Sequence, residues 1–129
     1  MKIDNKKARI ILAVIIAVSL VISTVYMFAK QGFHEDELLT YNLANSSKQL
    51  NVDGGWNSPE DFNEYLAVSP DDRFDYAQVY ENQIIDASHP PLYYALVHTV
   101  CSFFPSVFSK WLAYSINVLA MAGIFDYAL

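Results

Sequence analysis

The chain opens with a hydrophobic stretch that is long enough to cross a membrane. Residues Ile10 to Ala29 form an unbroken run of 20 residues without a charged side chain. As an α-helix this run would be about 30 Å long, which matches the hydrocarbon core of a bilayer. Its length and the poor cleavage site at its end favour an uncleaved anchor over a secretory signal peptide. We therefore predict a transmembrane helix over 10–29, preceded by a short tail over 1–9.

Two more apolar stretches lie toward the end of the chain. Pro90 and Pro91 suit the first turn of a helix, where their missing N–H groups would have no partner, and apolar residues follow to Phe104. We predict a second transmembrane helix over 90–108 and, after a turn, a third over 111–129. Because the third ends without a polar tail, we expect the sequence to be the N-terminal part of a longer protein.

The segment over 30–89 is polar and has three helix-start patterns. They are Glu35–Glu37, Ser58–Asp61 and Ser69–Asp72. The first places acids in the first turn of a helix with one apolar side, and the other two combine a serine N-cap, a proline and acids. The first helix should lie at the membrane surface, and the second should run to about Ala67. The third should cover much of 74–85, although Phe74, Tyr76 and Tyr80 also permit an extended strand there. The expected fold is an all-α polytopic helical bundle of an integral membrane protein.

Charge is divided unevenly along the chain, which as a whole has a formal net charge of −6. The region from Lys30 to Pro90 carries twelve acids against three bases, whereas the tail over 1–9 has four bases against one acid. Positive residues flanking a span tend to stay in the cytoplasm, so we expect a cytoplasmic N-terminus and an extracytoplasmic segment over 30–89. The sequence has no basic stripe that would indicate nucleic-acid binding.

Metal and thiol chemistry receive little support from the sequence. Cys101 is the only cysteine and lies in an apolar segment, so we expect a small buried hydrophobic residue. The side chains of His34, Asp36 and Asp86 are of types that bind metals, but these residues lack a tight ligand spacing. We therefore assign no cofactor and leave a divalent cation as an alternative. His98, in the middle of an apolar stretch, has a structural and a functional interpretation of equal weight.

Two groups of polar residues flank the apolar stretches and could carry chemistry. A helix that begins at the prolines would direct its free N–H groups and positive dipole end toward His89, which suits binding of a phosphate. The acids at 35–37 include a candidate general base for a hydroxyl, although acids next to a membrane span are often only a solvated, helix-capping cluster.

Three stretches together resemble a known family. They are His34–Glu37, Tyr41–Ser46 and His89–Tyr94. In this order, with a long outer loop before the last, they are similar to the N-terminal part of GT-C-fold membrane glycosyltransferases of the glycosyltransferase-39 type, which include protein O-mannosyltransferases and the aminoarabinose transferases of lipid A. The resemblance covers residues 2 to about 117.

The resemblance implies transfer of a hexose or pentose from a polyprenyl-phosphate donor to an acceptor hydroxyl at the outer face of a bacterial plasma membrane. By resemblance, Asp36 is the carboxylate base and Glu37 is its neighbour in the catalytic motif. His89 occupies a position that contacts the lipid phosphate, with Tyr93 beside it. His34 and Asp86 are possible supporting residues. Since family members continue through many more spans, we expect this chain alone to be inactive.

An alternative function is that of a non-catalytic membrane protein whose acidic outer loop binds a partner or cations. Under this alternative the acids at 35–37 are a solvated surface. Under either function, we expect Tyr93 and Tyr94 to be aromatic residues of the membrane interface. The sequence names neither the sugar nor the acceptor.

Overall fold

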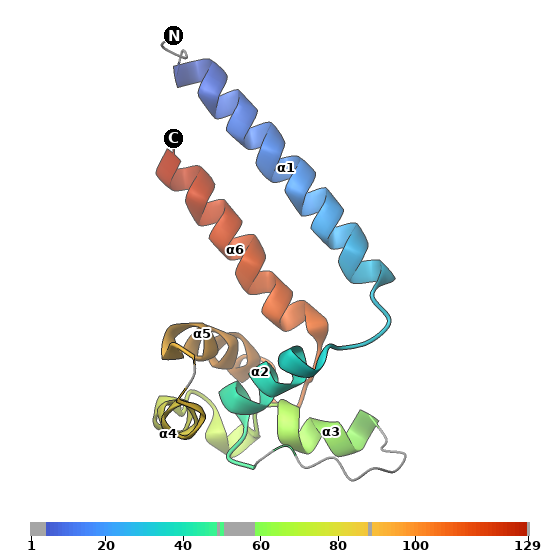
Figure 1. Ribbon diagram of the computed structural model, residues 1–129, viewed down its shortest axis with the longest axis vertical. Coiled ribbons are helices and arrows are strands. Elements are labelled where there is room, and N and C mark those ends of the chain that lie inside the picture. The colour runs from blue at the N-terminus through green and yellow to red at the C-terminus, as the bar shows by residue number, and fades with distance from the viewer. Residues whose placement is uncertain (1–4, 49, 51–58, 88, 129) are drawn as a thin grey trace. The chain divides into compact units, whose positions relative to one another are not determined.

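The computed structural model describes residues 5–48, 50, 59–87 and 89–128 of the chain, and among these residues it contains helices and no strands. This confirms the all-α expectation. The elements, in chain order, are α1 (Asn5–Ala29), α2 (Glu35–Asn45), α3 (Pro59–Leu66), the 3₁₀ turn η1 (Pro70–Asp72), α4 (Tyr76–Asp86), α5 (Pro91–Ser102) and α6 (Lys110–Ala128) (Figure 1).

The helices belong to two compact units. In unit 1, α1 is grouped with α6 from Tyr114 onward, while unit 2 comprises Phe33–Ala113 and holds α2 to α5. The two units follow the division of the sequence into strongly apolar ends and a more polar middle.

Unit 1 contains the helix that the first apolar run predicts. Over Lys6–Ala29 the helix has a mean hydropathy of 2.7, and of the described helices it alone is long and apolar enough to cross a membrane. The crossing itself stays a prediction. Within unit 1, the hydroxyl of Tyr114 on α6 lies 2.7 Å from Thr24 Oγ1 and 3.0 Å from Ser23 Oγ, so polar side chains on the two helices meet.

Unit 2 is organised around α2, which packs against α3, α4 and α5, while α4 also packs against α5 (Figure 1). Its apolar core consists of small and branched side chains that are almost completely buried, namely Ala44, Leu66, Val68, Val79 and Val97. Their burial removes apolar surface from water, which is the main force that holds such a unit together.

Polar side chains of α4 and α5 form hydrogen bonds with the last carbonyl groups of α2. The last carbonyls of a helix have no partner within it, and burying them unpaired would be costly. The amide of Asn82 donates to Leu43 O at 2.9 Å, and His98 Nδ1 lies 2.9 Å from Ala44 O. These two bonds fix α2 to both α4 and α5.

The helix predicted from the Ser69–Asp72 pattern is interrupted. Ser69 does cap a helical turn, since its hydroxyl accepts from Asp71 N–H at 3.2 Å, but that turn is only η1. Phe74 then takes a left-handed backbone conformation with φ 61°, which a helix cannot continue. A new N-cap, Asp75, starts α4.

The helix of the second predicted span, over 90–108, is shorter than expected, and its crossing of a membrane stays a prediction. Helix α5 begins at Pro91 as expected but ends at Ser102, and 12 residues give a length of only about 18 Å, less than a bilayer crossing requires. The chain then turns within unit 2. The N–H of Ser106 donates to Val68 O at 2.8 Å, and the hydroxyl of Tyr41 donates to Ser109 O at 2.7 Å. The segment that follows α5 is therefore held in the same compact unit as the helix.

Candidate functional site

A pocket of about 330 Å³ in unit 2 lies where the first turns of α2 and the start of α5 meet. Its lining comes from two stretches that are far apart in the sequence: Asp36, Leu39 and Thr40 from one, and His89, Pro90, Tyr93 and Tyr94 from the other. The pocket thus brings together Asp36, predicted as the base, with His89 and Tyr93, predicted as donor contacts.

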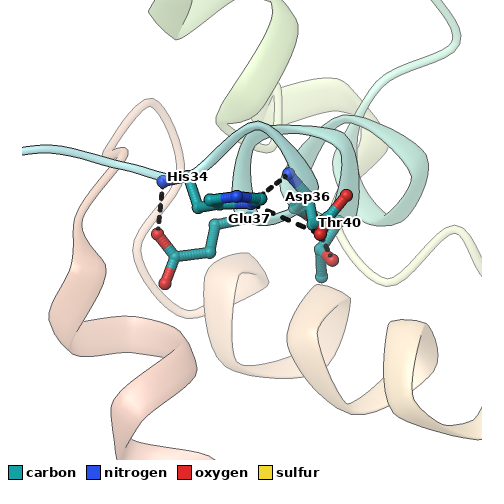
Figure 2. A network of polar contacts seen from close by, with 4 residues as sticks. All are labelled: His34, Asp36, Glu37 and Thr40. Carbon is teal, nitrogen blue, oxygen red and sulfur yellow. Dashed lines mark hydrogen bonds and ion pairs between the residues drawn. The ribbon is translucent and has the colours of Figure 1, made fainter.

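A capping box holds the start of α2 in place. The N–H of His34 donates to Glu37 Oε2 at 2.8 Å, and the N–H of Asp36 donates to His34 Nδ1 at 3.3 Å (Figure 2). Reciprocal bonds of this kind satisfy amide groups that the helix itself leaves without partners. They fix the first turn of α2, and with it the backbone that carries Asp36.

The carboxylate of Asp36 is accessible, with 87% of its side chain exposed, and its Oδ2 lies 3.3 Å from His34 Nδ1. That nitrogen can serve one partner at a time: without a proton it accepts from the amide of Asp36, and with one it donates to the carboxylate. Farther along the helix, Thr40 Oγ1 donates to Asp36 O at 2.7 Å (Figure 2). An exposed carboxylate at a helix N-terminus suits a base that must reach a substrate hydroxyl.

His89 is oriented by a second carboxylate. Its Nδ1 lies 2.8 Å from Asp86 Oδ2; the side chain of Asp86 is 16% exposed, whereas that of His89 is 52% exposed. With Nδ1 facing Asp86, a proton on Nε2 would let the imidazole donate to an anionic ligand. The N-cap of α5 is Pro90, which has no side-chain acceptor, so the first amides of the helix can also serve an anion.

Two tyrosines complete the pocket wall. Burial raises the pKa of Tyr93, and the nearby Glu37 carboxylate adds to this effect. Burial likewise raises the pKa of Tyr94, with a further contribution from Asp86, while a hydrogen bond with Thr40 acts in the opposite direction. Both hydroxyls therefore stay protonated at neutral pH and can donate to an anionic ligand.

The remaining predicted residues have supporting positions. Glu37 and His34 belong to the capping box and do not line the pocket, and Asp86 lies behind the lining residue His89. The described residues contain no group of three or more His, Cys, Asp or Glu side chains placed to hold a metal ion.

Sequence reasoning missed Thr40 and did not assign Tyr94 to the site. Thr40 could have been predicted from its distance in sequence to Asp36. It follows Asp36 by four residues, and residues four apart lie on the same face of a helix. Tyr94 was interpreted as an interfacial residue, but it is buried against α2 with 6% of its surface exposed. Only the packing of α5 on α2 reveals its role.

His98 and Cys101 lie in the core of unit 2 and outside the pocket. His98 is fully buried and links α5 to Ala44 O, which gives it a structural role. Cys101 is fully buried, and burial raises the pKa of its thiol to about 11. The expectation that it acts as a buried small residue is confirmed.

Comparison of the chain with protein-family models, with curated proteins and with solved structures found no match. Its function is therefore argued from the geometry of the pocket and from the motifs that line it.

Proposed function

We propose that this chain is the N-terminal part of a GT-C-type membrane glycosyltransferase, similar to the glycosyltransferase-39 type, that transfers a sugar from a polyprenyl-phosphate donor to an acceptor hydroxyl. The observation that carries the proposal is the shared pocket of Asp36 and His89. A carboxylate able to accept a proton and a group able to hold a phosphate line one cavity, as this reaction requires.

The proposed step is a displacement at the first carbon of the sugar. Asp36 accepts the proton of the acceptor hydroxyl while the hydroxyl oxygen forms a bond to that carbon. The bond from the carbon to the phosphate oxygen breaks, and polyprenyl phosphate leaves with the electron pair. A positioned carboxylate base typically contributes about 10²- to 10⁴-fold to such a step.

The leaving phosphate gains negative charge, which His89, Tyr93 and the first amides of α5 can stabilise. The carboxylate of Asp86, 2.8 Å from Nδ1, holds the imidazole of His89 in place beside the pocket. Because these donors are already in place, little reorganisation accompanies the reaction, and stabilisation of developing charge is then most effective.

The proposal includes a membrane placement in which α1 crosses the bilayer and unit 2 lies at the outer face. The four bases of the tail over 1–9 support a cytoplasmic N-terminus. The short α5, which lies within unit 2, is not used as a span in this placement. The donor phosphate lies at the membrane surface, and so must the pocket.

The alternative function, binding of a partner or cations by the acidic loop, is less well supported. It gives no reason for a basic His89 and an acidic Asp36 to line the same cavity.

The test is sugar transfer by membranes that contain the protein expressed from its complete gene. Radiolabelled polyprenyl-phosphate hexoses and aminopentoses are supplied with total membrane lipid and protein as acceptors. We expect protein-dependent transfer from at least one donor. Transfer no greater than that of membranes lacking the protein, with every donor of both sugar classes, would favour the binding function instead.

A further inference from the structure

An exposed apolar surface on unit 2 has no role in the proposed reaction. We define the apolar face as Tyr76, Tyr80 and Ile84 of α4, Leu92 and Leu96 of α5, and Phe103, the C-cap of α5. Between 44% and 71% of each residue is exposed. Large apolar side chains grouped in this way on a solvent-exposed surface usually mark an interaction site.

Helix geometry gives α4 and α5 one exposed apolar stripe each, on helices that pack against each other. In α4 the three residues are spaced by four, so they form a single stripe along the helix. In α5, Leu92 and Leu96 are also four apart, and the side of the helix opposite to them carries buried Tyr94 and His98. The two stripes join where Tyr76 Oη lies 3.0 Å from Thr99 Oγ1.

The composition of the apolar face fits a lipid surface. Helix α5 contains no Asp, Glu, Lys or Arg, and the three α4 residues of the face are uncharged. The aromatic members combine an apolar ring with, in tyrosine, a polar hydroxyl, which is the composition favoured where membrane meets water.

The short connection to α1 also favours a lipid bilayer as the partner of the apolar face. Only Lys30, Gln31 and Gly32 separate the end of α1 from the start of unit 2. An extended chain covers at most about 3.6 Å per residue, so three residues keep the beginning of unit 2 within roughly 15 Å of the end of the span. If α1 crosses the bilayer, unit 2 is held next to its surface.

We propose that the apolar face of α4 and α5 docks unit 2 onto the outer surface of the lipid bilayer, with its side chains inserted among the headgroups and upper acyl chains. Such shallow insertion is the usual binding mode of amphipathic helices at membranes. The inference rests on the membrane placement within the proposed function and not on sugar transfer.

The experiment places an environment-sensitive fluorophore at single introduced cysteines in the full chain, reconstituted in vesicles of phosphatidylcholine and phosphatidylglycerol. Tyr80→Cys and Leu96→Cys report on the apolar face. Glu81→Cys, an exposed neighbour of Tyr80, and Asp71→Cys are the matched controls. Because native Cys101 is fully buried, labelling of the unsubstituted chain reports loss of the fold.

We expect blue-shifted emission and quenching by brominated lipid at positions 80 and 96, and quenching by aqueous iodide at 71 and 81. Iodide quenching at 80 and 96 as strong as at the controls would overturn the proposal, because the face would then lie in water. Protection of 80 and 96 from both quenchers would also overturn it, in favour of a second copy or another protein. Neither result depends on enzymatic activity, so failure here is distinct from failure of the proposed transferase function.

Discussion

Replacing His89 with alanine should separate its contribution to donor binding from its contribution to stability. The side chain of His89 is half-exposed, and its Nδ1 lies 2.8 Å from Oδ2 of Asp86, so the strength of this contact is reduced by solvent. Exposed pairs of this kind contribute about 0.2–1 kcal/mol to stability. We therefore expect His89→Ala to change the free energy of unfolding by no more than about 1 kcal/mol.

The effect on the donor should be larger. A hydrogen bond from a charged group to a phosphate contributes about 1.5–3 kcal/mol, and about 1.4 kcal/mol corresponds to a factor of ten. The donor concentration needed for half-maximal transfer should rise about tenfold to a hundredfold in His89→Ala. His89→Lys should retain much of the wild-type donor dependence, because lysine supplies a positive charge at the same place.

The assay measures transfer as a function of polyprenyl-phosphate sugar, using purified protein in detergent from the complete gene, and thermal unfolding of the same samples. An unchanged donor dependence in a folded His89→Ala variant would remove His89 from the phosphate site. A large loss of thermal stability with unchanged donor dependence would instead assign it a purely structural role.

Two further predictions concern the stability of unit 2. Glu37→Gln should keep the capping box, since glutamine can also accept from His34 N–H, whereas Glu37→Ala should destabilise the protein by about 1 kcal/mol in thermal unfolding; equal stability of the two variants would contradict the capping role. Burial lowers the pKa of His98, so below about pH 6.5 the unfolded chain binds more protons at this site than the folded one. The free energy of unfolding should therefore decrease as the pH is lowered below this value. His98→Gln should flatten that part of the pH profile, and an unaltered profile would show that another group causes it.

Local signals were sufficient to predict most helix starts. The uncharged run of α1, the acids before α2 and the prolines at α5 act through their immediate neighbours, so the sequence shows them directly. The end of α5 could not be predicted in the same way. It depends on bonds such as Ser106 N–H to Val68 O, which join residues far apart in the chain.

The candidate site was only partly predictable for the same reason. Asp36 and His89 were each identified from their motifs, but nothing in the spacing of two distant motifs shows that they line one pocket. That proximity arises from the packing of α2 on α5, which buries Tyr94 and brings it to Thr40. The break at Phe74 was missed because a positive φ at a non-glycine residue is rare and has no sequence signature.

The most direct measurement of the central claim is the rate of sugar transfer by Asp36→Asn beside that of Glu35→Gln, both made in the complete protein. Each change removes one negative charge from the first turn of α2, but only Asp36 lines the pocket. If Asp36 is the base, Asp36→Asn should lose about 10²- to 10⁴-fold in rate while remaining folded and inserted, and Glu35→Gln should stay close to wild type. Near-normal transfer by Asp36→Asn, or an equal loss in both variants, would contradict the assignment of Asp36 as the catalytic base.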